Sequence, residues 1–149
     1  MRCRDLMKTP LVTCLKTDSV RWCAQLMKDW NIGFLPVVDA DGRVAGVLTD
    51  RDLTLRVLAE GMPAATEART VMTKDVVSVH PDADFTTAEE ALASARKSRV
   101  PLVDENGICR GVISLADVAQ ADSRRRAGRV VQAVTSREAT PAHVPWNVV

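Results

Sequence analysis

The second half of the sequence repeats the first half at a constant offset. When Met7 is aligned with Met72, the register holds without a gap as far as Asp52 and Asp117. Identical residues fall at positions that are sensitive to backbone geometry: Pro36 with Pro101, Asp39 with Asp104, Gly42 with Gly107, and Gly46 with Gly111. A repeat of about 50 residues indicates a supersecondary unit that packs against its own copy.

Each copy predicts the element order β-α-β-β-α. In copy one, a strand over 12–15 precedes a helix of about 13 residues, and Asp18 and Ser19 are good N-cap types for its start. Strands over 35–38 and 44–48 flank a tight turn that ends at Gly42, and a second helix begins at Thr49. Copy two repeats this pattern with strands over 76–79, 100–103 and 108–113, and with helices that begin near residue 82 and at Ser114.

One such unit has a three-stranded sheet with helices on one face, so its other face stays apolar and exposed unless a second sheet covers it. The sequence therefore predicts a mixed α/β (α+β) fold in which two repeats pack sheet to sheet with pseudo-twofold symmetry. We expect repeat 1 at 2–60, a linker at 61–68, repeat 2 at 69–122, and a basic helical extension with an extended tail at 123–149. Two equivalent clefts then lie between the copies, and small molecules favour such interfaces.

Composition and charge are those of an ordinary soluble globular protein. Of the 149 residues, 46% are hydrophobic and 26% are charged, and the net charge is +1. Nothing global therefore favours nucleic acid or an anionic membrane as a partner. No apolar run approaches the ~20 residues of a membrane span, and the N-terminus does not resemble a signal peptide, so we expect a cytoplasmic protein.

The sequence also argues against a metal site and against catalysis. Its cysteines and histidines are Cys3, Cys14, Cys23, Cys109, His80 and His143. Because none of them form a clustered ligand pattern, we expect free thiols in a reducing compartment and no structural metal. No nucleophile motif, Walker loop or dinucleotide-binding motif is present. Asp50 and Asp52 lie two positions apart near a helix start and make a poor acid/base pair, so we expect no enzyme.

A hydroxyl residue stands at each strand–helix junction with a carboxylate three residues later: Thr49 with Asp52, and Ser114 with Asp117. This spacing is typical of a capping box. It also suits a nucleotide, because a helix start offers N–H groups to a phosphate and an Asp one turn later can accept ribose hydroxyls. Arg51 adds a planar fork of donors for a phosphate. The two interpretations are compatible.

The repeat resembles the CBS domain, first named for cystathionine β-synthase, and the chain resembles a stand-alone tandem CBS pair. The resemblance covers roughly residues 2–122. In copy one it is carried by Asp5-Leu6-Met7, by LPVVD at 35–39, by Gly42 and by GVLTDRD at 46–52. In copy two it is carried by Val71-Met72, by VPLVD at 100–104, by Gly107, and by GVIS at 111–114 with Asp117.

The resemblance implies regulatory binding of an adenosine-containing ligand, AMP, ADP, ATP or S-adenosylmethionine, with no cofactor required. It assigns phosphate and ribose contacts to Thr49 and Asp52, and to Ser114 and Asp117. It assigns backbone contacts with adenine to two groups of residues: Leu11, Val12 and Thr13 with Leu35 and Pro36, and Val76, Val77 and Ser78 with Val100 and Pro101.

Copy two departs from the family pattern. Leu115-Ala116 stands where copy one has Asp50-Arg51, so a cation for phosphate is missing there. Lys97-Ser98-Arg99 stands where copy one has Ile32-Gly33-Phe34, and Arg99 either restores a cation to one cleft or is simply solvated. We therefore expect the two clefts to bind unequally.

The first helix carries two apolar stripes. Val20, Ala24 and Met27 share one face, and Trp22, Leu26 and Trp30 recur every four residues on another. An apolar arc this wide favours a partner surface over packing within the monomer, because aromatic residues are enriched in interface cores. We expect Trp22, Leu26 and Trp30 at a homodimer interface, which agrees with the family's use of this helix.

The leading hypothesis is a non-catalytic ligand sensor that signals to an unidentified partner protein. The alternative is a ligand-free structural or protein-interaction module that dimerises. A third is nucleic-acid binding through the basic run 124–126 and Arg129, which the neutral overall charge disfavours. Trp146, Val148 and Val149 in the tail are candidates for docking on the body or on a neighbour.

Overall fold

The computed structural model describes residues 1–121 and 124–136, and the expected docking residues of the tail lie outside this range. Repeat 1 contains β1 (Cys14–Leu15), α1 (Val20–Trp30), β2 (Phe34–Val38), β3 (Val44–Thr49) and α2 (Asp50–Asp52), which continues as the π-helical η2 (Leu53–Leu58). Repeat 2 contains α4 (Phe85–Ala95), β4 (Arg99–Val103), β5 (Cys109–Ser114) and α5 (Leu115–Ala121). Short helices η1 (Cys3–Asp5) and α3 (Ala68–Val71) precede the repeats, and α6 (Arg124–Thr135) follows them.

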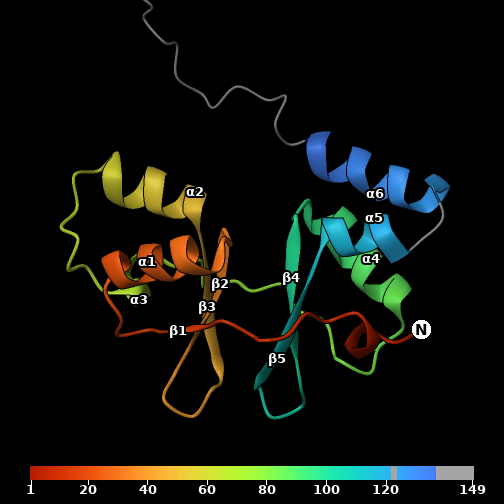
Figure 1. Cartoon of the computed structure of the whole chain (residues 1–149), viewed down its shortest axis with the longest axis horizontal. Helices are drawn as coiled ribbons and strands as arrows, with labels where there is room; N and C mark the ends of the chain where they lie inside the picture. Colours follow the sequence, from red (N-terminus) through yellow and green to blue (C-terminus); the bar gives the residue numbers. More distant parts are fainter. Residues whose placement is uncertain (122–123, 137–149) are drawn as a thin grey trace, which may run out of the picture.

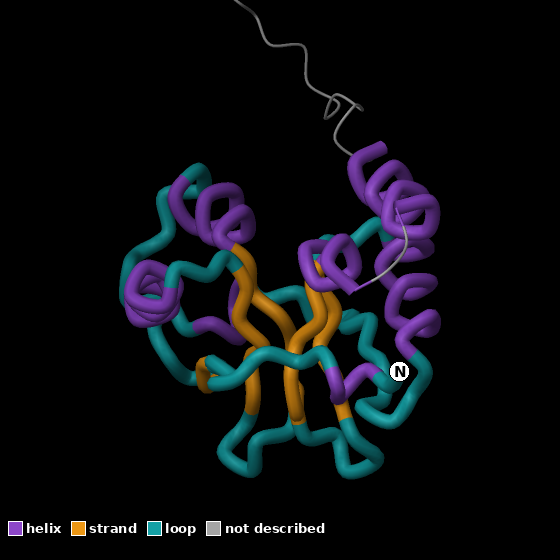
Figure 2. The backbone as a smooth tube through the Cα atoms, turned by 45° about the vertical axis from the view of Figure 1, so that its right-hand side comes forward, coloured by secondary structure: helices purple, strands orange, loops and turns teal. Residues whose placement is uncertain are grey.

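The predicted sheet-to-sheet pair of repeats is confirmed. Figures 1 and 2 show the strands gathered in the middle of the molecule and the larger helices on the two outer sides. Two separate buried cores lie beneath the helices, one around Leu35 and Leu48 and the other around Leu102 and Ile113. The hairpin ends meet where Arg43 bridges Ile108 and where the Val44 N–H donates to the Gly107 carbonyl at 2.9 Å.

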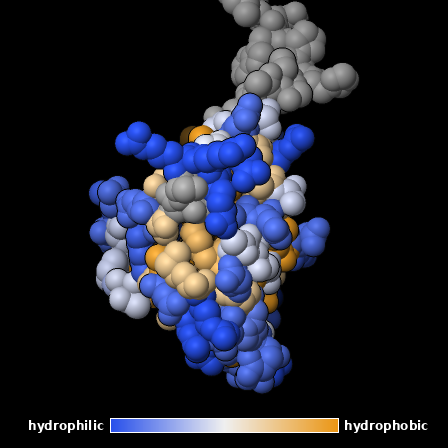
Figure 3. All heavy atoms as spheres, turned by 90° about the vertical axis from the view of Figure 1, so that its right-hand side faces the viewer, coloured by the Kyte–Doolittle hydropathy of each residue, from blue (hydrophilic) through white to orange (hydrophobic). Residues whose placement is uncertain are grey.

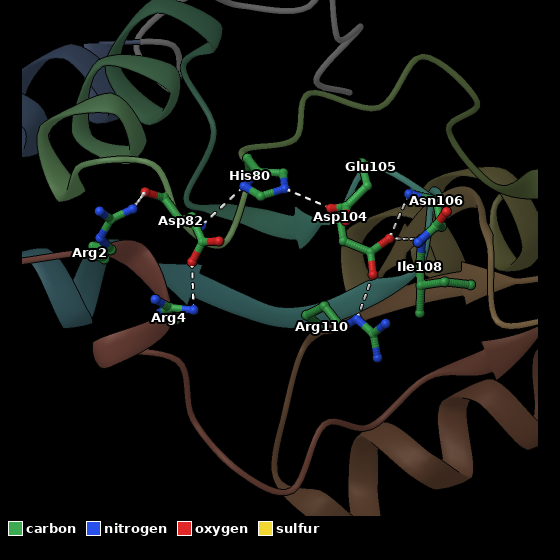
Figure 4. A network of polar contacts seen from close by, with 9 residues as sticks. All are labelled: Arg2, Arg4, His80, Asp82, Asp104, Glu105, Asn106, Ile108 and Arg110. Atoms are coloured by element: carbon green, nitrogen blue, oxygen red, sulfur yellow. Dashed lines mark hydrogen bonds and ion pairs between the residues drawn. The ribbon is translucent and has the colours of Figure 1, made fainter.

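The two hairpin turns have the same internal hydrogen bonds. In repeat 2, Asp104 Oδ1 accepts from the N–H groups of Asn106 and Ile108 at 3.0 and 2.9 Å (Figure 4). Asp39 does the same in repeat 1. Gly42 and Gly107 then take φ values of 83° and 80°, which only glycine adopts without strain. The matched Asp and Gly positions therefore encode one turn twice.

The first strand of each repeat is shorter than the sequence suggests. Residues 14–15 alone form β1, which pairs in parallel with β2, rather than 12–15. In repeat 2 the predicted strand 76–79 is reduced to one parallel bridge between Val79 and Leu102. The correction has a physical reason: Val76 and Val77 line a cleft between the repeats instead of extending the sheet ladder.

The short leader helices are exchanged between the repeats. The segment before repeat 1 packs on repeat 2: Cys3 N–H donates to the Ala83 carbonyl at 3.0 Å, and Arg4 pairs with Asp82 at 2.7 Å (Figure 4). The segment before repeat 2 packs on repeat 1, where the Ala68 N–H donates to the Asp18 carbonyl at 2.8 Å. Each leader therefore completes the core of the repeat it does not precede.

Two equivalent glycines make this exchange possible. A Cβ at Gly46 would lie 2.6 Å from the Met72 sulfur, and a Cβ at Gly111 would lie 2.8 Å from the Met7 Cβ. The strand backbone is thus in direct contact with the methionine that ends the opposite leader. Glycine in a strand often marks such a close approach.

The outer helices of the two repeats are covered differently. In repeat 2, α6 packs on α4 and α5 through the buried residues Ala127 and Val130, and this side of the molecule is largely hydrophilic (Figure 3). In repeat 1, α1 buries Val20, Cys23 and Met27. Ala24, which we expected on the core face, is exposed. With 3.6 residues per turn, Cys23 rather than Ala24 lies on the same face as Val20 and Met27.

We predict that Gly46→Ala lowers the free energy of unfolding by about 1–3 kcal/mol, because the new methyl group meets the Met72 side chain and overpacks the contact. Urea denaturation followed by circular dichroism measures this change. Gly128→Ala is the matched control, since nothing lies within 4 Å of its Cβ position in α6 and a helical glycine is itself destabilising. Equal stability of the two variants would contradict the proposed role of the Met72 contact.

Candidate functional site

A cleft of about 520 Å³ lies between the repeats, a volume in the usual range for small-molecule sites. Repeat 1 contributes the end of β3, α2 and η2, and repeat 2 contributes the segment before its sheet and the end of α4. The lining residues are Gly33, Phe34, Val47, Thr49, Asp50, Arg51, Asp52, Leu55, Arg56, Thr73, Asp75, Val76, Val77, Ala95, Arg96, Lys97, Ser98, Arg99 and Pro101.

The cleft combines expected site residues from both repeats. It brings Thr49, Arg51 and Asp52 of repeat 1 together with Val77 and Pro101 of repeat 2. Residues of repeat 1 that we expect to contact ribose and phosphate therefore share one cleft with residues of repeat 2 that we expect to contact adenine. The remaining candidates lie outside this cleft lining: Leu11, Val12, Thr13, Leu35, Pro36, Ser78, Val100, Ser114 and Asp117.

Two of the expected adenine residues are core residues. Leu35 and Val100 are both fully buried, each within the hydrophobic core of its own repeat. Their side chains therefore pack in the cores, and the contacts with adenine expected of these strands are backbone contacts. Side chains alternate between the two faces of a strand. Phe34, next to Leu35, therefore lies on the opposite face of the strand, and it lines the cleft.

The capping-box interpretation of the strand–helix motif is confirmed. Thr49 Oγ1 accepts from the Asp52 N–H at 3.0 Å, and Asp52 Oδ2 accepts from the Thr49 N–H at 3.0 Å. The Arg51 N–H donates to Asp50 Oδ1, and the Asp50 N–H donates to the Gly33 carbonyl. Because these first N–H groups already have acceptors and α2 is only three residues long, the helix start does not offer a phosphate site by itself.

The groups still available for a ligand are side-chain atoms. The Thr49 hydroxyl accepts a hydrogen bond through its oxygen, and its own proton can still be donated. Asp52 Oδ1 lies 3.4 Å from Arg56 Nη2, four residues along the same helix. Asp50 lies over Gly33, where a Cβ would be 2.6 Å from Asp50 Oδ2. The two carboxylates have different partners, as expected of a poor acid/base pair.

Three exposed cationic residues come to this cleft from repeat 2: Arg96, Lys97 and Arg99. Arg96 ends α4 in the left-handed conformation, with φ of 52°. Arg99 is exposed to solvent and lines the cleft that contains Thr49. The cations of repeat 2 therefore add to Arg51 of repeat 1.

In repeat 2 the equivalent motif already has a cationic partner, Lys8, which directly follows the crossed leader. Ser114 and Asp117 form the same pair of reciprocal contacts, and Lys8 Nζ lies 3.0 Å from Asp117 Oδ1. Burial raises the pKa of the Asp117 carboxyl, but hydrogen bonds from Ser114 and the ion pair with Lys8 outweigh burial and hold the pKa below its usual value. Thr73 occupies the position equivalent to Lys8 in the other cleft.

Sequence reasoning missed Lys8, Arg56 and Arg96 as site residues. The spacing of Arg56, four residues after Asp52, is a recognisable signal for an ion pair on a helix. Lys8 and Arg96 had no such signal, because their positions depend on the exchange of the leaders and on the pairing of the repeats.

The cysteine thiols differ in acidity: a hydrogen bond with Cys14 lowers the pKa of Cys23 below its usual value. All four are buried and free, and burial raises the pKa of Cys109 to about 11. Within residues 1–121 and 124–136, no group of three His, Cys, Asp or Glu side chains is arranged to hold a metal ion. In the same part of the chain, no helix has both the length and the apolar character needed to cross a membrane.

Comparison with known proteins identifies relatives across most of the chain. The CBS domain profile matches residues 3–59 and again 68–124. The CBS domain-containing protein YhcV of Bacillus subtilis is 35% identical over 116 residues, which are 78% of this chain and 81% of that protein. The CBS domain protein PAE2072 of Pyrobaculum aerophilum, solved with AMP, has a TM-score of 0.75 at 22% identity, covering 89% of this chain and 99% of that one.

A second solved structure has the same fold. The CBS domain pair of protein MJ0100, in complex with 5′-methylthioadenosine and S-adenosylmethionine, has a TM-score of 0.73 at 24% identity. The match covers 80% of this chain and 94% of that one.

We predict that Lys8→Gln raises the pKa of the Asp117 carboxyl, because the ion pair that favours its charged form is lost. NMR titration of that carboxyl measures the shift, and Lys74→Gln, at an exposed position, is the control. With its folded-state pKa below the unfolded value near 3.8, Asp117 stabilises the fold above that pH, and this stabilisation is lost as pH falls through the folded-state pKa. In Lys8→Gln this stabilisation begins to be lost at a higher pH. An unchanged pKa of Asp117 in this variant would disprove the interaction between Lys8 and Asp117.

Proposed function

The chain belongs to the CBS domain family, and on that premise we propose that it is a non-catalytic regulatory module that binds an adenosine-containing ligand between its repeats. The observation that carries the proposal is the cleft that joins Thr49, Arg51 and Asp52 of repeat 1 to Val77 and Pro101 of repeat 2. Such a site has a few directed polar groups beside apolar surface, which is the usual composition of a small-molecule site.

Each part of the ligand has a chemically matched group. The Thr49 hydroxyl donates to a phosphate oxygen, and Asp52 Oδ1 accepts from the ribose hydroxyls in place of its long contact to Arg56. Arg51 neutralises phosphate charge. Val77 and Pro101 supply apolar surface for the adenine ring.

The relatives support this class of ligand. PAE2072 was solved with AMP, and the MJ0100 pair was solved with 5′-methylthioadenosine and S-adenosylmethionine. These ligands share adenine and ribose, the two parts for which the cleft offers an apolar surface and a carboxylate.

Ligand binding would act by shifting the packing of one repeat against the other. A ligand shifts an equilibrium only through different affinities for the two states, and contacts to both repeats provide that difference. A partner protein would then respond to the altered arrangement.

We predict that Asp52→Ala abolishes the tighter binding event in calorimetric titrations of AMP, ATP and S-adenosylmethionine, because the ribose acceptor is removed. Asp117→Ala is the matched control: it removes an equivalent capping carboxylate, at a similar cost of about 1 kcal/mol, from the motif occupied by Lys8. It leaves the tighter event intact. Circular dichroism confirms that both variants are folded, and a wild-type protein that binds no adenosine ligand would refute the proposal.

We also propose that the chain forms a homodimer through α1. Trp22 and Trp30 are each 50% exposed on this helix, while Leu26 is half-buried against the core of repeat 1. In repeat 2 the helix layer is covered by α6, and no helix among residues 1–121 and 124–136 covers α1 in the same way. A second copy, pairing its own α1 with this face, would bury both indole rings.

We predict that Trp22→Ala weakens the dimer by about 2 kcal/mol, roughly thirtyfold in dissociation constant, because a central interface tryptophan is lost. Sedimentation equilibrium measures the constant. Val131→Ala removes an exposed apolar side chain from α6 and leaves the dimer unchanged. If the wild type is a monomer at high protein concentration, the proposed interface is wrong, whatever the cleft binds.

A further inference from the structure

The two strand–helix motifs use their polar groups differently, although they are equivalent in the duplicated fold. In repeat 1, Asp52 Oδ2 accepts from the Thr49 N–H, and Asp52 Oδ1 lies 3.4 Å from Arg56 Nη2. The Thr49 hydroxyl accepts from the Asp52 N–H and can still donate its own proton. Repeat 1 therefore offers its cleft a hydroxyl proton and a loosely held carboxylate oxygen.

In repeat 2 the same groups have closer partners within the chain. Ser114 Oγ donates to Asp117 Oδ2 at 2.6 Å, and the Ser114 N–H donates to the same oxygen at 2.7 Å. The other oxygen, Asp117 Oδ1, lies 3.0 Å from Lys8 Nζ. The hydroxyl proton and both carboxylate oxygens of this motif are therefore already bonded to the protein itself.

Lys8 reaches this motif from the solvent side. Its side chain is 67% exposed, whereas that of Asp117 is 6% exposed. The ammonium group therefore covers the accessible edge of a carboxylate that its own junction otherwise encloses. An ammonium–carboxylate contact of this length is a charge-assisted hydrogen bond, which is among the stronger polar contacts in proteins. A ligand that needs this carboxylate as an acceptor has to compete with Lys8.

The duplication shows that the fold does not require a lysine at this position. Thr73 is the equivalent residue, and it lines the first cleft together with Asp52. Lys8 and Thr73 each directly follow the methionine that contacts a strand glycine of the opposite repeat. The two residues are therefore held at matched places, and they differ in chemistry.

We propose that Lys8 is an intramolecular competitor that blocks the ribose acceptor of the second cleft and limits strong binding to the cleft containing Thr49. This inference rests on the proposed function. A ligand that places its ribose at Asp117 must first displace the ammonium group. Because Lys8 belongs to the same chain, its effective concentration at Asp117 is high whatever the ligand concentration. Lys8 thus determines which of two equivalent motifs binds ligand.

The test is calorimetric titration of the full chain with 5′-methylthioadenosine, which has adenine and ribose but no charged group at neutral pH. An uncharged probe separates competition for Asp117 from attraction of a phosphate to Lys8. We expect the wild type to show one strong event per chain. In Lys8→Thr, which gives repeat 2 the residue of repeat 1, the second event should become at least about tenfold tighter, because a hydrogen bond to a charged acceptor becomes available.

Two further variants assign each event to its cleft. In Asp52→Ala the strong event should disappear, whereas Lys8→Thr/Asp52→Ala should keep the new event at Asp117. The reciprocal exchange Thr73→Lys should weaken the strong event by at least about tenfold, because it brings an ammonium group to Asp52.

Lys74→Thr is the matched control, because it removes the same charge from an exposed position outside the cleft lining. It should bind like the wild type. Circular dichroism checks that each variant is folded, and Lys8→Gln, which also removes the ammonium group, should show the same gain as Lys8→Thr.

Three results would overturn this inference while the proposed function stands. They are two equal events in the wild type, an unchanged second event in both Lys8 variants, and a second event that weakens in them because Lys8 itself holds the ligand. If the wild type binds AMP and not 5′-methylthioadenosine, the same variants are compared with AMP and the same outcomes decide. Failure of the wild type to bind 5′-methylthioadenosine, AMP, ATP and S-adenosylmethionine refutes the proposed function itself.

Discussion

The structure depends on the crossed packing of the two leader segments. Each leader ends in a methionine that lies directly against the strand backbone of the other repeat, at Gly46 or Gly111. Ala68 and Val71 of one leader, and Cys3 of the other, are almost completely buried in the opposite core. Separating the repeats would expose these residues, so their burial stabilises the association of the two halves.

The same crossing decides what the clefts contain. The chain that leaves each leader runs along the opposite repeat before entering its own sheet, so residues of both repeats line the cleft. Thr73 follows one leader and Lys8 follows the other at the equivalent position. Lys8 pairs with Asp117, whereas Thr73 lines the cleft beside Asp52 without adding a charge. The two carboxylates therefore have different cationic partners, Arg56 for Asp52 and Lys8 for Asp117.

Local features were predictable from the sequence, and the associations of distant segments were not. The Asp39 and Asp104 turns, the Ser19 cap and the capping box of Thr49 follow from short-range chemistry, and the structure contains each of them. The repeat also predicted the paired sheets. The exchange of leaders was not predictable, because the repeat pattern is the same whichever copy a leader packs on. The pairing of Lys8 with Asp117 depends on that exchange.

The capping box also shows which of the candidate site residues the fold itself requires. In both repeats the hydroxyl and carboxylate are bonded to the backbone, so they are needed to shape the strand–helix junction. Lys97 and Arg99, in contrast, are exposed side chains in the cleft lining. Exposed side chains can change at little structural cost. A duplicated scaffold can therefore keep two equivalent junctions while the charged residues around them differ, as Lys8 beside Asp117 and Thr73 at the equivalent position in repeat 1's cleft do.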